Sequence, residues 1–291
     1  MEHLVLSGSG PNGLAQLACL QRLQDKGNLD IDLIKSMYGV SAGGIICVLL
    51  LLHIPIQDII DYLLERPWNK VFDLNVEVML ECNEKAGLWS TQVIRESIMP
   101  FFQVAEVSID ITMAEFYQQN HVELHILTTE LERFCAVDLH HSTFPDLKVI
   151  EALQMSSVMP LVFMPFRYKE CIYLDGAFTE NYPLMRCLSN LPVEEHDKVL
   201  GIHIYKSKIV PPELSMIQLL QYTMIQIGEL VSKNARDKPL CKYDIACSPT
   251  YGLYDTELWK LLTGTREERM MIYNNGLTCI DAFLEDKSSL V

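Results

Sequence analysis

The sequence of 291 residues is poor in positive charge. Its 23 lysines and arginines stand against 38 aspartates and glutamates, which gives a formal net charge of −15 at neutral pH. Proteins that hold nucleic acids present a basic surface to the phosphate backbone, so this balance argues against a DNA or RNA partner. It also argues against electrostatic docking on anionic membranes and leaves the insertion of apolar side chains as a way to reach a lipid surface.

The sequence also lacks the long apolar segments of membrane and secreted proteins. Its longest apolar run, residues 45–52, is much shorter than the roughly 20 residues that cross a bilayer, and the N-terminus has no basic segment of a signal peptide. The nine scattered cysteines include no C-x-x-C pair, which is typical of reduced thiols in a reducing compartment. We therefore expect a cytoplasmic protein that meets membranes peripherally and has no transmembrane segment.

Linkers rich in proline, glycine or serine, internal repeats and low-complexity stretches are absent as well. We expect one domain over residues 1–291, with a motif-bearing core at 3–205 and a C-terminal helical part at 206–291. Apolar periodicity predicts strands that alternate with helices, which indicates a layered α/β fold. The predicted strands span 3–7, 36–38, 122–129, 134–139, 172–174 and 198–205. The predicted helices span 14–26, 42–55, 56–65, 90–100, 149–157, 213–235 and 266–285, while 67–90 and 237–256 are the least clear segments.

One motif joins the second strand to the helix that follows it. Residues 39–43 read Gly-Val-Ser-Ala-Gly, which is the G-x-S-x-G pattern of a nucleophile elbow. Gly39 and Gly43 let the chain turn tightly and leave space around Ser41, and the N-terminus of the next helix favours negative charge beside that serine. The alternative interpretation is a glycine-rich turn in which the serine only caps the helix.

A second glycine motif follows the first strand. Residues 8–13 match G-x-G-x-x-G, which is the fingerprint of a dinucleotide site in some α/β folds. However, the second strand ends at Gly39 rather than at the acidic residue that such a site needs, and Pro11 removes one N–H. The other interpretations are an oxyanion hole formed by the N–H groups of Ser9 and Gly10, and a tight turn without a function.

A serine nucleophile needs a base, and two kinds of residue come into question. Asp175 follows an apolar strand and precedes Gly176. A carboxylate with an ordinary pKa of about 3.9 is a weak base, so this role requires burial; the alternative is a plain Asp-Gly turn. The later histidines lie outside the late strand–loop context of a triad histidine, so we expect core or surface roles for them. They are His53, His121, His125, His140, His141, His196 and His203.

The glycine loop, G-x-S-x-G and Asp-Gly-Ala stand in the order found in the patatin-like phospholipases, and the sequence resembles that family over nearly its whole length. Residues 156–160 resemble the stretch before the family's aspartate. Asn181 and Pro183 after the aspartate are similar to its D-G-G/A…N-x-P element, and a closing helix carries Gly276 in its middle. The chain departs from the pattern at Ser9, where the family usually has a third glycine, and at Asn12, where it usually has a basic residue.

The resemblance implies a three-layer α/β/α sandwich related to the catalytic domain of cytosolic phospholipase A2. It implies that Ser41 is the acylated nucleophile and that Asp175 acts on it directly as the base, with no cofactor and no metal in catalysis. The oxyanion donors would come from Gly8, Ser9 and Gly10. The residues that support the motifs would be Gly39, Gly43, Gly176 and Asn181.

We therefore predict a lipid acyl hydrolase that cleaves fatty-acyl esters of phospholipids, lysophospholipids or acylglycerols through an acyl-enzyme. Its substrate would be met at a membrane or a lipid aggregate, and the candidates for apolar contact are residues 161–164 and 216–224. Two other hypotheses stay open. One is a lipid-binding or scaffold protein that keeps the fold without catalysis, and the other is a dinucleotide-binding oxidoreductase built on the Gly8 loop.

Overall fold

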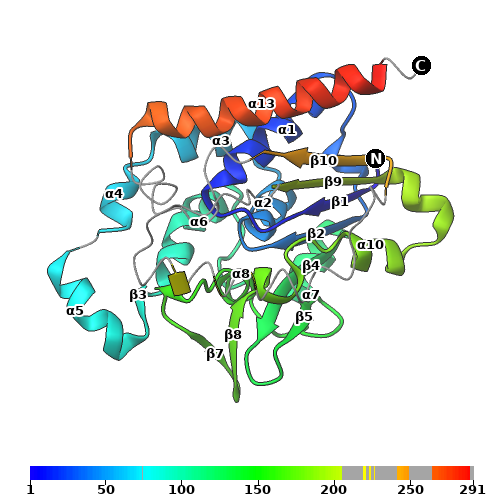
Figure 1. The fold of residues 1–291 in the computed structure, drawn as a ribbon. Coiled ribbons are helices and arrows are strands. Elements are labelled where there is room, and N and C mark those ends of the chain that lie inside the picture. The colour runs from blue at the N-terminus through cyan, green and yellow to red at the C-terminus, as the bar shows by residue number, and fades with distance from the viewer. Residues whose placement is uncertain are drawn as a thin grey trace.

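A mixed β-sheet of eight strands with helices on both faces forms the centre of the protein (Figure 1). The computed structural model describes residues 1–73, 75–204, 241–248 and 264–288, together with 219, 220, 223 and 226. The strand order is β10-β9-β1-β2-β4-β8-β7, and β5 pairs with β4 as well. The predicted three-layer α/β/α arrangement is confirmed.

Five parallel strands make up the longer part of this sheet. They are β1 (His3–Leu6), β2 (Ser36–Val40), β4 (Glu123–Glu130), β9 (Val199–Ile204) and β10 (Tyr243–Cys247). Every residue of β1 and β2 is buried, as expected of parallel strands that are covered on both faces. The antiparallel strands are β5 (Cys135–Leu139), β7 (Phe166–Tyr168) and β8 (Cys171–Asp175). A separate pair joins β3 (Gly87–Trp89) to β6 (Leu161–Phe163).

The two faces of the sheet bury different side chains of the same strands. Leu4 and Leu6 of β1 belong to the larger core, whereas Val5 belongs to a smaller core on the other side. The larger core lies under α1 (Gly13–Asp25), α2 (Ala42–Leu51), α3 (Ile56–Glu65) and α13 (Arg266–Ser288). The smaller core lies under α10 (Leu184–Asn190).

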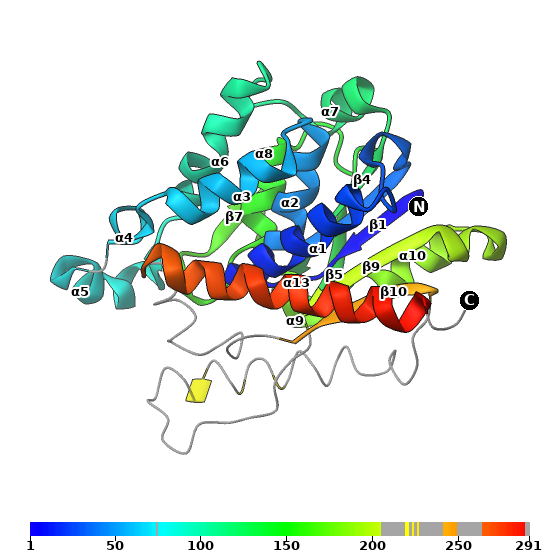
Figure 2. The same ribbon diagram turned by 90° about the horizontal axis from the view of Figure 1, so that it is seen from above.

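Six further α-helices belong to the described residues. They are α4 (Trp68–Val71), α5 (Val76–Lys85), α6 (Gln92–Val104), α7 (Met113–Asn120), α8 (Val149–Ser156) and α9 (Ala177–Glu180). Figures 1 and 2 show that α4 and α5 project from one end of the sandwich. Within the described residues, no helix combines the length and hydropathy that a membrane crossing requires.

Most of the predicted elements occur within a few residues of their expected bounds. The sequence did not predict α4, α5 and β3 in the unclear segment 67–90, nor β10, which is a strand within the part expected to be helical. The predicted helix over 213–235 lies outside the described residues except at 219, 220, 223 and 226. The helix predicted to reach residue 55 ends at Leu51, and His53 then adopts a positive φ of 55°.

Helix α13 packs along α1, and the two lie side by side in Figures 1 and 2. A Cβ atom added at Gly276 would lie 2.6 Å from Cα of Ala15. Glycine at this position therefore sets the separation of the two helices.

We expect Gly276→Ala to destabilise the protein. Overpacking against backbone costs about 1–3 kcal/mol, which exceeds the roughly 1 kcal/mol that alanine gains over glycine in a helix. The exposed Asn274→Ala on the same helix is the control, since it changes helix propensity alone. Urea denaturation measures both, and a Gly276→Ala variant as stable as the wild type would contradict the argument.

Candidate active site

Ser41 occupies a strained turn between β2 and α2. Its φ of 51° and ψ of −122° lie in a region that residues with a side chain rarely adopt. A Cβ at Gly39 would lie 2.6 Å from the backbone N of Gly44, and one at Gly43 would lie 2.6 Å from the carbonyl oxygen of Ser7. Both glycines are thus required by close backbone approaches, which gives the G-x-S-x-G pattern a structural reason.

A buried serine ties this elbow to the rest of the fold. The N–H of Ser41 donates a hydrogen bond of 2.8 Å to Oγ of Ser156, and the Ser156 hydroxyl donates one of 2.6 Å to the carbonyl oxygen of Leu127. Ser156 ends α8, and Leu127 lies on β4. The sequence placed Ser156 only within a family-like stretch, because no local pattern reveals a contact across 115 residues.

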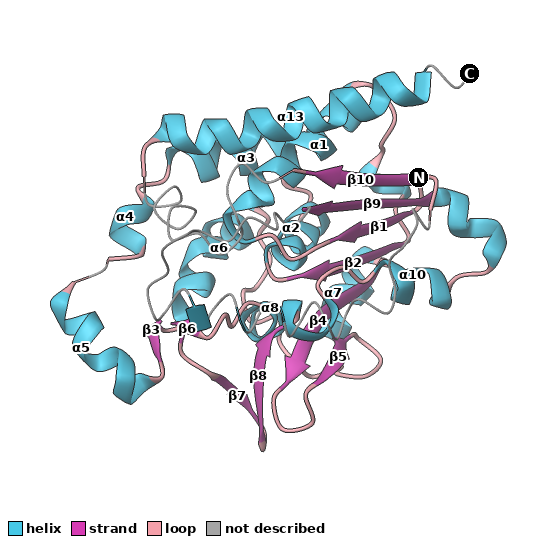
Figure 3. Cartoon of the chain, viewed as in Figure 1, coloured by secondary structure: helices cyan, strands magenta, loops and turns pink. Residues whose placement is uncertain are grey.

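The register of the sheet brings Asp175 next to this elbow. Val40, the last residue of β2, pairs with Leu127 of β4, and Asp175, the last residue of β8, pairs with Thr128. Since β5 pairs with both Leu127 and Thr128 from the other side of β4, β2 and β8 share one edge and meet end to end there (Figure 3). Neighbouring rungs are about 3.4 Å apart. Ser41, which follows β2, and Asp175, which ends β8, therefore lie near neighbouring rungs of β4.

Asp175 is held in a buried turn and is 3% exposed. Its Oδ1 accepts a hydrogen bond of 2.9 Å from the N–H of Ala177, and its own N–H donates to the carbonyl oxygen of Val158. A Cβ at Gly176 would lie 3.0 Å from Cγ1 of Val40 and closer still to the carbonyl oxygen of Leu127. The Asp-Gly pair is therefore fixed by the junction of the strands.

Gly8 and Asn181 form a reciprocal pair across the chain. The N–H of Gly8 donates to the carbonyl oxygen of Asn181 at 2.9 Å, and Nδ2 of Asn181 donates to the carbonyl oxygen of Gly8 at 3.3 Å. The N–H of Gly8 is consequently engaged, which corrects its predicted role as an oxyanion donor. Gly8 instead positions the loop that follows. Asn181 holds Gly8 in place, which explains why the motif has an asparagine there.

Ser9 anchors the same loop to α1. Its hydroxyl donates a hydrogen bond of 2.9 Å to Oε1 of Gln16, whose Nε2 donates to the carbonyl oxygens of Ser7 and Ile202. Ser9 and Gln16 are both buried. The hydroxyl that departs from the family pattern thus has a partner, and Gln16 is a positioning residue that the sequence analysis missed. Its signal was a polar residue at a buried helix position.

The N–H groups of Ser9 and Gly10 remain as candidate oxyanion donors. Gly10 has a φ of 49°, and neither N–H has an acceptor in the part of the chain that the structure describes. Both residues line the same cavity as Ser41 and Asp175. Asn12, the second departure from the family pattern, is 1% exposed and lies outside the lining of this cavity.

The cavity has a volume of about 210 Å³ and mainly apolar walls. Its apolar lining includes Leu14, Ile46, Leu49, Ile59, Trp68, Phe72, Phe101, Met159 and Phe163. Among the candidates for lipid contact at 161–164, Val162 and Phe163 are buried, and Phe163 belongs to this wall. Most of the other segment expected to contact lipid, residues 216–224, lies outside the described residues.

Asp175 is the acidic residue that lines this cavity, and no histidine among the described residues lines it. The histidines are engaged elsewhere or exposed. His3 contacts Ser36 and Glu195, His125 contacts Asp138, His196 contacts Leu188, and His53 lies at the surface.

A family model described as patatin-like phospholipase matches residues 4–188, more than half of the chain. The chain belongs to the patatin-like phospholipase family. It is 26% identical over 198 residues to a probable lipid hydrolase of Invertebrate iridescent virus 6, with 67% of this chain and 64% of that protein covered. It is 25% identical over 202 residues to an uncharacterized protein of Acanthamoeba polyphaga mimivirus, with 69% and 65% covered. The chain therefore spans less than two thirds of the length of these viral relatives.

The fold is also similar to a solved structure. VipD from Legionella pneumophila superposes with a TM-score of 0.57 at 15% identity, over 98% of this chain and 67% of that one. The resemblance that the three motifs indicated is thus confirmed for the family and for the fold.

Ser9→Ala tests the anchor of the glycine loop. The change leaves Oε1 of Gln16 buried without its donor, so we expect the free energy of unfolding to fall by about 1–3 kcal/mol. Ser189→Ala removes a hydroxyl that bonds the Arg186 carbonyl oxygen at the surface, and we expect a much smaller loss from it. Equal losses in urea denaturation would show that the Ser9–Gln16 contact carries no special weight.

Proposed function

We propose that this protein is a lipid acyl hydrolase that cleaves fatty-acyl esters of phospholipids, lysophospholipids or acylglycerols with a Ser41–Asp175 dyad. The observation that carries the proposal is the end-to-end junction of β2 and β8. At this junction β2 leads into a strained serine and β8 ends in a buried carboxylate, and both residues line one apolar cavity. Membership of the family and the name of the iridescent virus relative support the same class of substrate.

In the first step, Asp175 accepts the hydroxyl proton as Oγ of Ser41 attacks the ester carbonyl carbon. The negative oxygen of the tetrahedral intermediate is stabilised by the N–H groups of Ser9 and Gly10 and by the N-terminus of α2. The intermediate then collapses, and the alcohol or lysolipid leaves with the proton held by Asp175. An acyl ester on Ser41 remains.

In the second step, Asp175 takes a proton from a water molecule as that water attacks the acyl ester. The second tetrahedral intermediate uses the same N–H donors. Its collapse breaks the bond to Oγ, returns the proton to Ser41 and releases the fatty acid. The apolar walls of the cavity suit the acyl chain, since each buried methylene contributes about 0.8 kcal/mol.

The dinucleotide interpretation of the glycine loop loses its support. The N–H of Gly8 is bound to Asn181, Pro11 has none, and the family match covers the loop. The hypothesis of a lipid-binding protein without catalysis remains a distinct outcome of the first experiment below.

A fluorophosphonate probe tests whether Ser41 is activated. We expect the wild type to be labelled, Ser41→Ala to be unlabelled, and Asp175→Asn to be labelled about 10²–10⁴-fold more slowly, which is the usual contribution of a general base. Ser189→Ala serves as the matched serine control, and circular dichroism checks that each variant is folded. Labelling of Ser41→Ala at the wild-type rate would overturn the dyad, and a folded wild type that binds lipid without labelling would favour the non-catalytic hypothesis.

We further propose that α5 brings the enzyme to lipid surfaces. Val76 and Leu80 lie one helical turn apart on this projecting helix and are 73% and 75% exposed (Figure 1). Trp68 and Phe72, just before α5 in the chain, line the cavity. Two exposed apolar side chains that follow a part of the cavity wall in the chain suit contact with a lipid aggregate, and this contact should depend little on salt.

Val76→Asp combined with Leu80→Asp should lower the hydrolysis of neutral phospholipid vesicles at least tenfold. The hydrolysis of a soluble short-chain nitrophenyl ester should stay unchanged, because the dyad is not altered. Val193→Asp is the control, since Val193 is 77% exposed in the short 3-10 helix Val193–Lys198 before β9. A parallel loss on both substrates, or no loss on vesicles, would argue against a role for α5 in lipid contact.

A further inference from the structure

Two copies of one short pattern lie on β4 and β5, away from the cavity. Residues 123–125 read Glu-Leu-His and residues 138–140 read Asp-Leu-His. The sequence alone gives neither copy a function. Side chains alternate between the two faces of a strand, so the acid and the histidine of each copy, which are two residues apart, lie on the same face.

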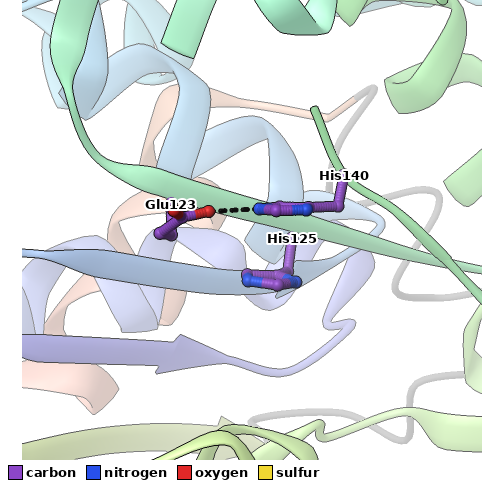
Figure 4. Close-up of side chains that lie close together, drawn as sticks. All are labelled: Glu123, His125 and His140. Atoms are coloured by element: carbon purple, nitrogen blue, oxygen red, sulfur yellow. Dashed lines mark hydrogen bonds and ion pairs between the residues drawn. The ribbon is translucent and has the colours of Figure 1, made fainter. Parts of the chain in front are cut away.

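The register brings the two copies into contact. Ile126 pairs with Leu139, so the next residues outward, His125 and His140, stand opposite each other. Each histidine contacts the acid of the other strand: His140 bonds Glu123, and His125 bonds Oδ2 of Asp138 at 2.8 Å. Figure 4 shows the two imidazoles lying one above the other beside Glu123.

The imidazoles are oriented from behind. Nδ1 of His125 is held by Asp138, and Nδ1 of His140 is held by Oγ of Ser142 at 2.8 Å. In His125, an Nδ1–H that donates to Asp138 leaves the lone pair on Nε2, which is the arrangement found in carboxylate–histidine–metal sites. In His140, Nε2 donates to Glu123 and Nδ1 accepts from Ser142, so an ion bound at Nε2 replaces the proton there. Nε2 of His125 makes no hydrogen bond to any residue that the structure describes.

The ligand atoms are close enough for a single ion. The candidate ligand atoms of Glu123, His125 and His140 all lie within 4.8 Å of one another. His141 offers a further nitrogen, since its Nδ1 is buried without a hydrogen-bond partner in the described part of the chain and lies 3.3 Å from Oε2 of Glu123. Two histidines and a glutamate form a common zinc ligand set.

We propose that Glu123, His125 and His140 bind one divalent transition-metal ion, with zinc as the representative, and that Asp138 and Ser142 hold the two imidazoles in place. The ring centroids are 4.2 Å apart and the planes differ by 9°. Because the lone pairs lie in the ring planes, binding turns the rings out of this stack. The ion cross-links the start of β4 to the end of β5.

This site is independent of the proposed hydrolase mechanism. His125 and Glu123 lie three and five residues before Thr128, the rung of Asp175, which is about 10–17 Å along β4. The site therefore has a structural role, and its loss should leave the labelling of Ser41 intact.

Zinc titration of the metal-stripped full chain, in competition with a chromophoric chelator, tests the proposal. We expect one zinc ion per wild-type chain and a loss of affinity of at least 100-fold in Glu123→Gln and in His140→Gln. Asp138→Asn should lose about 10–100-fold, the usual effect of removing a partner that orients a ligand. His53→Gln is the control, because His53 is an exposed histidine outside the cluster.

A second readout guards against misfolded variants. Zinc should raise the melting temperature of the wild type and of His53→Gln but not that of Glu123→Gln, whose fold is checked by circular dichroism without metal. The proposal fails if the wild type takes up no zinc at tens of micromolar. It fails equally if Glu123→Gln and His140→Gln bind zinc as the wild type does, since the cluster is then only a hydrogen-bonded network.

Discussion

The arrangement of the site depends on the place where β2 and β8 meet on one edge of β4. Two strands that run toward each other must both leave the sheet there, because neither can continue past the other. The chain leaves β2 through the strained turn at Ser41 and leaves β8 through the turn at Asp175 and Gly176. Ser156 fills the junction by bonding both the elbow and β4. Ser41 and Asp175 therefore leave the sheet at adjacent rungs of β4 as a consequence of its topology.

The glycine loop is organised from two sides around the same junction. Asn181, just after α9, holds Gly8 through both its backbone and its side chain. Gln16 of α1 holds Ser9, the carbonyl oxygen of Ser7 just after β1, and the carbonyl oxygen of Ile202 within β9. These contacts fix the backbone before any substrate arrives, which is the condition for N–H groups to stabilise a developing charge without reorganisation. A serine in place of a glycine is compatible with this loop because its hydroxyl points to Gln16.

The sequence predicts the local parts of this structure well and the distant contacts poorly. Gly39, Gly43 and Gly176 could be recognised because close backbone approaches demand glycine at fixed spacing from Ser41 and Asp175. The engagement of Gly8 by Asn181 and the anchoring roles of Ser156 and Gln16 could not, since they join residues whose partners are set by strand register. The elements α4, α5 and β10 were missed because each lies in a segment without clear apolar periodicity. The paired Glu-Leu-His and Asp-Leu-His copies were visible, but their meaning depends on the register of β4 with β5.

The contact between α1 and α13 bears on how the protein is made. Both catalytic candidates and the glycine loop are encoded by residue 181, whereas the helix that covers α1 begins only at Arg266. During synthesis, Ala15 and Cys19 must wait for Gly276 before their side of α1 is closed. A ribosome-bound chain that has emerged only as far as residue 265 would therefore present the α13-facing side of α1 uncovered, and exposed apolar surface of this kind favours aggregation.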